Sequence, residues 1–470
     1  MTSAPAARLR RLNNLPAGGQ DRRPLPQRVL TSWWTWLTVG MVIVFAACLA
    51  ALYVQITADQ PSLDGTVPGV NPSAVRLGAW YATSTLAFWI VVFLLADRFR
   101  PQRWTVWLMS LGWGGSVATY VAYLVNSWAA MQLQVSGNFD PATSARAAIF
   151  VAPFVEEAAK ATVLFGLAML VRYELVSKVS LVVMAGLSAA GFAFTENIIY
   201  YARAIVYSSQ TINVGDAESA VVELVWLRGF WLAFGHPLFT MMTGLGVAVA
   251  LRTRSKVVRV LAPLAGYGLA VLGHMVFNSQ ASLTQGNQQL LVYFTLALPL
   301  LIAAVVYVVR QVLKQGRLIR ARLVDYVLMG WLKPTDPEVF ARLRTRLWAL
   351  LVALTRGWRV FVATRGLQRT LTELAYLRDA EVRGVIDATG DERVRELLDL
   401  SRSQRAAGID DPHGMKLSLP RLRRRAAADF PPPTHPGPAG LGGSWPAPTS
   451  SPVGSQRHSP VDPTWGPPGR

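Results

Sequence analysis

Eight apolar stretches, each roughly 20 residues long, fill the first two thirds of this 470-residue sequence. A helix rises ~1.5 Å per residue, so a stretch of this length crosses the ~30 Å hydrocarbon core of a bilayer. Apolar residues make up 52% of the chain and charged residues only 16%, below the ~25% charged residues of ordinary soluble domains. The sequence therefore predicts an all-α, polytopic membrane helix bundle with about eight transmembrane helices, at 33–56, 77–96, 104–127, 147–171, 179–201, 229–251, 257–278 and 290–309.

Basic residues in the connections follow an alternating pattern. One set of connections and flanks holds twenty Lys and Arg residues, whereas the other holds only Arg76, Arg146, Arg203 and Arg228. Because basic loops stay on the cytoplasmic side, we expect a multi-pass plasma-membrane protein with both termini in the cytoplasm. The same pattern accounts for much of the net charge of +19, so we expect the lipid bilayer as a partner and no nucleic acid.

The composition divides the chain into four regions. We expect a basic cytosolic N-terminal segment (1–32), an eight-helix membrane domain (33–309), a cytosolic helical region (310–412) and a disordered, Pro-rich C-terminal tail (413–470). The one cysteine, Cys48, lies inside an apolar stretch. A disulfide framework and a cysteine-ligated metal cluster within the chain are therefore excluded.

Ionisable residues inside the apolar stretches are concentrated in four consecutive spans. A charge in the bilayer centre costs at least ~2.5–3.5 kcal/mol, so ionisable residues there indicate a functional site or a buried ion pair. Measured from the extracytoplasmic end of each span, these groups lie at depths of roughly 6 to 14 Å, although neighbouring spans run in opposite directions. We therefore expect a single site in the outer half of the membrane, built from Glu156, Glu157 and Lys160, then Glu196, Asn197 and Tyr200, then His236, then His274 and Asn278.

Two glutamate positions and two histidines suit hydrolysis in either of two ways. Imidazole and carboxylate groups are standard zinc ligands, and a further carboxylate beside the metal-bound water would be its general base. Without metal, a Glu–His pair could activate water while the second histidine and Asn278 hold the oxyanion. Glu156 and Lys160 stand four residues apart on one helix face and can form an ion pair.

The order of these motifs resembles the PrsW family of intramembrane proteases. The sequence has Glu156-Glu157-x-x-Lys160, then Glu196-Asn197-x-x-Tyr200, then one histidine in each of the next two spans. PrsW proteins are distantly similar to the CAAX-prenyl endopeptidase and bacteriocin-processing glutamate/histidine membrane proteases. The resemblance covers 147–278 as a catalytic core. It implies active-site roles for Glu156, Glu157, Glu196, His236 and His274, and cleavage of membrane-anchored substrates such as an anti-sigma factor.

Combining residues and resemblance, we expect a zinc-dependent intramembrane endopeptidase that cleaves a single-span membrane protein near its extracytoplasmic side. We assign His236, His274 and Glu196 to a Zn²⁺ ion, and catalytic roles to Glu156, Glu157 and Asn278. A metal-independent glutamate/histidine protease is the first alternative.

Two non-proteolytic alternatives also remain. A proton or metal-cation transporter would need polar groups at several depths, and the inner halves of these four spans carry almost none. A scaffold that signals through its tail would need no catalytic group.

Overall fold

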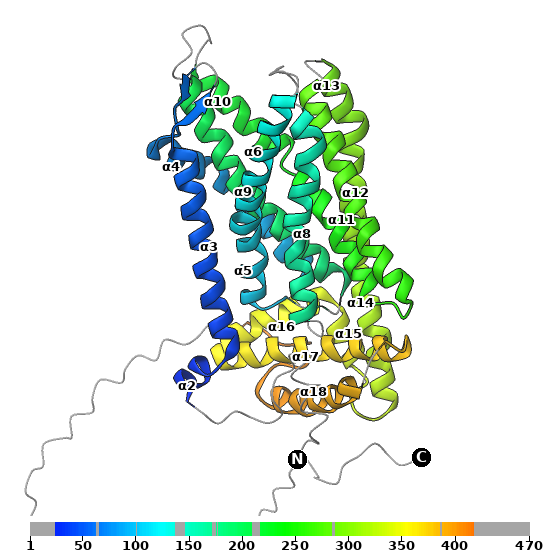
Figure 1. Ribbon diagram of the computed structural model, residues 1–470. Coiled ribbons are helices and arrows are strands. Elements are labelled where there is room, and N and C mark those ends of the chain that lie inside the picture. The colour runs from blue at the N-terminus through cyan, green and yellow to red at the C-terminus, as the bar shows by residue number, and fades with distance from the viewer. Residues whose placement is uncertain are drawn as a thin grey trace, which may run out of the picture.

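The computed structural model describes residues 24–62, 65–99, 101–136, 146–171, 175, 177–208, 217–283, 287–385 and 388–417. Figure 1 shows an upright helix bundle with a layer of helices lying across one end. The expected all-α polytopic fold is confirmed. The described residues also include one short antiparallel strand pair, β1 (Gln60–Ser62) with β2 (Gly65–Val67), after the first span. The expected segment up to residue 23 and the tail from residue 418 lie outside the described residues.

Seven helical segments of the described residues are long and apolar enough to cross a membrane. The chain is therefore a multi-pass membrane protein. Three of the segments contain an internal change of helix type or a break, with π-helical turns labelled η. The segments are α3 (Trp33–Thr57); α4 (Pro72–Ala96); α5 (Trp104–Gly112), η1 (Trp113–Ala118) and α6 (Thr119–Ser136); α9 (Lys178–Ser208); α10 (Ala217–Trp226), η3 (Leu227–Trp231) and α11 (Gly235–Ala250); α12 (Lys256–Leu283); and α13 (Asn287–Val292), η4 (Tyr293–Ala297) and α14 (Leu298–Leu328).

The remaining expected span, 147–171, corresponds to η2 (Ala147–Val151) followed by α8 (Ala152–Leu170). Its composition keeps it out of the seven, because Glu156, Glu157 and Lys160 fall within one short stretch. It nevertheless lies inside the bundle, where α8 packs against α6, α9, α11 and α12. The three charged side chains are buried by these neighbours rather than by lipid.

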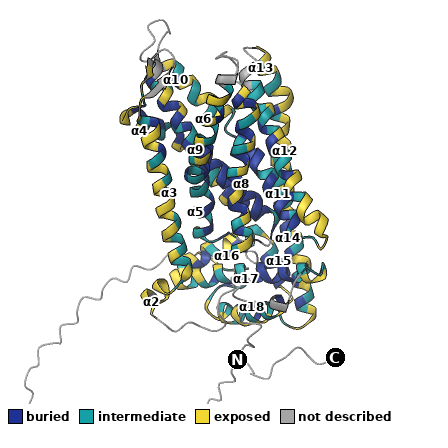
Figure 2. Ribbon diagram, viewed as in Figure 1, coloured by how far each residue is buried: buried dark blue, intermediate teal, exposed yellow. Residues whose placement is uncertain are grey.

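Helix α9 forms the centre of the bundle and is almost entirely buried, whereas α3 is largely exposed on the outside (Figure 2). Glycine residues at the contacts of α9 allow its backbone to lie close to the neighbouring helices. A Cβ atom on Gly114 would collide with the carbonyl of Ser188, and one on Gly191 with the carbonyl of Leu111. Close backbone contact between η1 and α9 therefore depends on glycine, and it fixes the height at which α9 presents Glu196.

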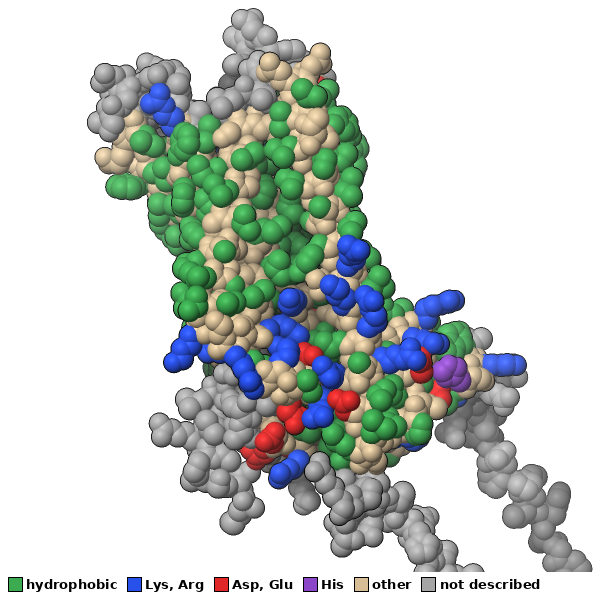
Figure 3. Space-filling view, turned by 90° about the vertical axis from the view of Figure 1, so that its right-hand side faces the viewer, with side chains coloured by type: hydrophobic (Ala, Val, Ile, Leu, Met, Phe, Trp, Pro, Cys, Tyr) green, Lys and Arg blue, Asp and Glu red, His purple; other side chains and the backbone are tan. Residues whose placement is uncertain are grey.

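Four further helices lie across one end of the bundle: α15 (Asp336–Ala341), α16 (Leu343–Arg356), α17 (Trp358–Val382) and α18 (Ala388–Ala407), with α2 (Leu25–Leu30) nearby (Figure 1). Helix α14 continues past its apolar part to Leu328 and packs against α15 and α17. Figure 3 shows Lys and Arg side chains in a band where these helices meet the apolar surface. We call this the basic end of the molecule.

Candidate active site

Lys160 lies at the centre of a cluster of ionisable side chains contributed by α8, α9, α11 and α12. Its ammonium Nζ lies 3.2 Å from Oε2 of Glu156 and 2.9 Å from Oε1 of Glu157. It also lies 3.0 Å from Nδ1 of His236 and 4.0 Å from the centre of the Phe192 ring. The Lys160 side chain has no exposed surface. One buried cation therefore forms ion pairs with two neighbouring carboxylates and has a further cation–π contact.

Glu157 is fully buried, and both of its oxygens have partners. Oε1 lies 3.0 Å from Nδ1 of His274, and Oε2 accepts a hydrogen bond of 2.7 Å from the Thr240 hydroxyl. A carboxylate can only accept, so Nδ1 of His274 carries the proton and donates it. The other ring nitrogen of His274, Nε2, is then left with a free lone pair. The face of that ring stacks on Phe239, with centroids 5.5 Å apart.

His236 has an equivalent carboxylate partner. Its Nε2 lies 2.9 Å from Oε2 of Glu196, and the same oxygen accepts a 2.6 Å hydrogen bond from the Arg228 guanidinium. Arg228 also donates to the side chain of Asn197 and lies over the Tyr200 ring at 3.8 Å. By the argument used for His274, Nε2 of His236 donates, and Nδ1 is the nitrogen that accepts.

Among the described residues, the cluster is most exposed at the side of Glu196. The side chains of His236, Glu196 and Arg228 are 14%, 18% and 22% exposed, while Glu157 and Lys160 have no exposed surface. Water and a substrate backbone can therefore approach at the Glu196 side, and Glu157 lies at the closed end.

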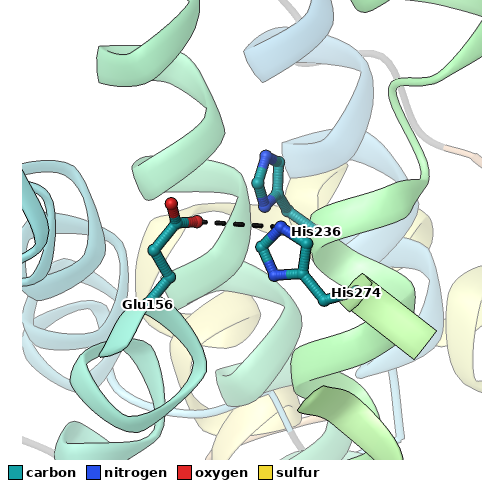
Figure 4. A group of neighbouring side chains, drawn as sticks. All are labelled: Glu156, His236 and His274. Atoms are coloured by element: carbon teal, nitrogen blue, oxygen red, sulfur yellow. Dashed lines mark ion pairs between the residues drawn. The ribbon is translucent and has the colours of Figure 1, made fainter. Parts of the chain in front are cut away.

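Glu156 brings a third carboxylate toward the two imidazole rings (Figure 4). Its Oε1 accepts from the Asn126 amide at 3.2 Å, and its Oε2 lies 3.8 Å from Nε2 of His274. The two histidine rings are nearly perpendicular, with centroids 5.2 Å apart. One possible ligand atom from each of Glu156, His236 and His274 falls within 4.8 Å of the others. This is a suitable donor set for a divalent metal ion.

The hydrogen bonds from the two histidine rings to Glu157 and Glu196 indicate whether this donor set fits a metal ion. Histidines that bind metal almost always donate their other ring N–H to a carboxylate, a backbone carbonyl or water. Both histidines do so here, to Glu157 and to Glu196, which turns Nε2 of His274 and Nδ1 of His236 away from those carboxylates. The donors therefore fit zinc. Metal binding requires the Lys160 ammonium to release His236 and Glu156.

Comparison with known proteins relates the central part of the chain to one family. Residues 102–306 match the family described as PrsW family intramembrane metalloprotease. These residues form a PrsW domain. The chain is accordingly a peptidase of the intramembrane type. No curated protein and no solved structure matches the chain.

The PrsW domain brings five of the six expected site residues together: Glu156, Glu157, Glu196, His236 and His274 are linked through the contacts above. Asn278 lies apart from this network. Its amide donates a 2.8 Å hydrogen bond to the Ala148 carbonyl in η2, so it joins α12 to the start of the α8 segment. Tyr200 contacts the cluster through Arg228.

Three residues of the PrsW domain join the cluster without having been singled out from the sequence. Thr240 stands one helical turn after His236, a spacing that could have identified it. Arg228 was counted from the sequence among the basic residues of the connections, because it lies just before the expected span 229–251. The observed span begins at Ser219, which puts Arg228 inside it. Asn126, on α6, belongs to none of the recognised motifs, and no signal in the sequence marks it.

Proposed function

We propose that this chain is a zinc-dependent intramembrane endopeptidase that hydrolyses a peptide bond of a single-span, membrane-anchored protein. The observation that carries the proposal is the paired arrangement of the two histidines. Each ring has one nitrogen hydrogen-bonded to a buried or half-buried carboxylate, and one possible ligand atom of each ring lies within 4.8 Å of a Glu156 oxygen. A purely structural histidine needs only one such partner.

The geometry favours Glu156, together with His236 and His274, as the ligand set. Glu196 is less suited to be a ligand, because its Oε2 already accepts from both Arg228 and His236. We therefore exchange the roles expected for Glu156 and Glu196. Glu157 and Glu196 orient the two imidazole rings, and Thr240 and Arg228 hold those carboxylates in place.

Glu196 is also the carboxylate best placed to move protons. It is partly exposed, and Oε1 has no hydrogen bond among the described contacts, whereas both Glu157 oxygens are engaged. In our proposal Glu196 takes a proton from the attacking water and returns it to the amine that leaves when the C–N bond breaks. A bound zinc ion would supply Lewis-acid stabilisation of the developing oxyanion.

We further propose that cleavage occurs on the extracytoplasmic side. The basic end carries the C-terminal helices, and the positive-inside rule assigns that end and both termini to the cytoplasm of a plasma-membrane protein. Glu196 and His274 lie in the second halves of α9 and α12, which begin at the basic end with Lys178 and Lys256. The substrate class proposed is that of single-span regulators such as anti-sigma factors.

A metal-independent protease is favoured by one specific observation. The Lys160 ammonium already contacts two of the three candidate ligand groups, His236 and Glu156. In that mechanism Lys160 supplies the fixed positive charge, and Glu196 with His236 activates the water.

The test compares new protein N-termini in host membranes that contain the wild-type chain or Glu156→Gln at equal expression. Glu223→Gln is the matched control, because Glu223 is an exposed carboxylate on α10. We expect termini beside the extracytoplasmic end of single-span proteins with the wild type and the control, and none with Glu156→Gln. Identical termini in all three membranes would reject the proposal. Elemental analysis and chelation of the purified protein then decide between the two mechanisms.

A further inference from the structure

An apolar groove runs along the outside of the bundle between α4 and α14, away from the active-site cluster. Its first part is a cavity of 280 Å³ between α4, α9, α11 and α14. A second cavity of 790 Å³ continues it past η3. The two share lining residues, so they form one groove: Trp89, Val92, Phe234, Leu301 and Val305. Among the described residues, none of the ionisable active-site groups lines it.

The groove is open toward the lipid. Three of the α14 residues that line it, Val305, Val309 and Leu313, are each more than half exposed. Its volumes fall in the range of sites for small molecules. A transmembrane helix, about 10–12 Å across, needs more room. The shape therefore suits acyl chains better than a peptide helix.

Positive charge collects where the groove meets the basic end. Arg98, just after α4, lines the first cavity. Lys178 stands one turn before the lining residue Val182 on α9, and Lys314 follows the lining residue Leu313 on α14. Lys178 interacts electrostatically with Lys314, Arg252 and Arg383. These are like-charge interactions, and they make the potential at this end of the apolar groove more positive.

The described carboxylates nearby offset only part of this charge. Asp379 already receives Arg252, Arg322 and Arg383. Asp97 is buried and accepts hydrogen bonds from Gln102 and Ser180. The mouth of the groove therefore favours an anionic group from outside the protein.

We propose that this groove binds an anionic phospholipid. One acyl chain lies between α4 and α14, and the phosphate is held near Arg98, Lys178 and Lys314. Basic side chains at a membrane surface attract anionic headgroups by about 1 kcal/mol each, and a zwitterionic headgroup gains little from them. The bound lipid fills the space between the outer helices and joins the membrane helices to the basic end. This site goes beyond the proposed proteolysis and does not depend on it.

The test measures lipid binding to the purified full chain in detergent, by native mass spectrometry and by thermal unfolding. The probes are phosphatidylglycerol, phosphatidylcholine and inorganic phosphate. Val305→Trp fills the groove, and Val306→Trp is its matched control. Val306 is the next residue on α14, is 48% exposed and does not line the groove. The double variant Arg98→Gln/Lys314→Gln removes charge at the mouth, and Lys256→Gln removes an exposed charge on α12.

We expect phosphatidylglycerol to bind the wild type and to raise its unfolding temperature, with phosphatidylcholine and phosphate much less effective. Val305→Trp and the charge double variant each weaken phosphatidylglycerol binding roughly tenfold or more, while Val306→Trp and Lys256→Gln leave it unchanged. Equal binding of the two lipids, or equal effects of Val305→Trp and Val306→Trp, would overturn the proposal. Stabilisation by inorganic phosphate alone would reduce the site to an anion site. Should Val305→Trp fail to fold, the charge double variant carries the test.

Discussion

Oε1 of Glu157 lies 3.0 Å from Nδ1 of His274, and both side chains are buried. A carboxylate cannot donate a hydrogen bond, so Nδ1 of His274 carries the proton. The other nitrogen, Nε2, therefore keeps the lone pair that can bind a metal ion or accept a hydrogen bond. The adjacent glutamate, Glu156, stands about 100° around the same helix and approaches the other nitrogen, Nε2, of the same ring. The two adjacent glutamates therefore contact the two nitrogens of one histidine: Glu157 holds the ring, and Glu156 belongs to the proposed donor set.

Glu157→Gln should weaken zinc binding, and it also removes one of the two carboxylate partners of Lys160. The amide keeps the shape but loses the charge, so it holds the His274 ring less firmly. Removing a carboxylate that orients a metal-binding histidine typically costs 10–100-fold in metal affinity or activity. Zinc affinity of the purified variant, measured against Glu223→Gln, checks the prediction. An unchanged affinity would mean that Glu157 has no such role.

Arg228 substitutions should lower turnover through Glu196. The guanidinium holds Glu196 with one nitrogen and Asn197 with another, a geometry that lysine cannot reproduce fully. We expect Arg228→Lys to lose roughly tenfold and Arg228→Gln roughly 100-fold in kcat, with smaller effects on KM. The graded response distinguishes orientation of Glu196 from a headgroup contact, which predicts similar activity for both variants.

The hydropathy of the sequence was sufficient to predict most of the membrane helices. The apolar stretches at 33–56 and 104–127 appear as helices with the expected starts at Trp33 and Trp104, since ~20 apolar residues have few alternatives to a membrane helix. The extents of other spans could not be predicted, because helices continue beyond the hydrocarbon. Helix α14 runs on to Leu328 as an amphipathic helix that packs on α15 and α17.

The sequence predicted most of the residues that form the site, but not which of them contact one another. Ionisable residues inside apolar stretches are costly, which is why Glu156, Glu196, His236 and His274 stood out. The sequence could not show that Lys160 contacts His236 on another helix, or that Arg228 reaches Glu196. These contacts depend on the relative rotation and height of the helices, which tertiary packing sets. Arg228 was misplaced because the α10 part of its span was not recognised.

Gly114→Ala should destabilise the bundle by about 1–3 kcal/mol, the usual cost of overpacking. A Cβ atom at this position meets the backbone carbonyl of Ser188 on α9, and backbone cannot rotate away as a side chain can. Gly166→Ala on α8 is the control, since a Cβ there meets nothing within 4 Å. Thermal unfolding in detergent should show a lower midpoint for Gly114→Ala only. A midpoint equal to that of the wild type would show that η1 and α9 can separate without cost.

Asp410 should make the helices at the basic end sensitive to acid. Partial burial raises the pKa of Asp410, but hydrogen bonds and charges from Lys333 and Arg405 outweigh it and lower the pKa to about 2. Because the folded value lies below the ordinary 3.8, the stabilisation is complete above about pH 4 and disappears as the pH falls toward 2. Asp410→Asn should therefore lower the unfolding temperature at pH 5 and make little difference near pH 2. Asp399→Asn, at an exposed ion pair, should change neither.

Lys160→Met should separate the metal-dependent from the metal-independent mechanism. The substitution leaves Glu156 and Glu157 buried without their cation, and breaking a buried ion pair in this way costs about 3–5 kcal/mol. If zinc uses Glu156, His236 and His274, the ion no longer competes with the ammonium. Zinc should then raise the unfolding temperature of Lys160→Met more than that of the wild type or of Lys256→Met. If Lys160 itself supplies the catalytic charge, zinc will restore neither stability nor cleavage to the variant, and chelation will leave the wild type fully active.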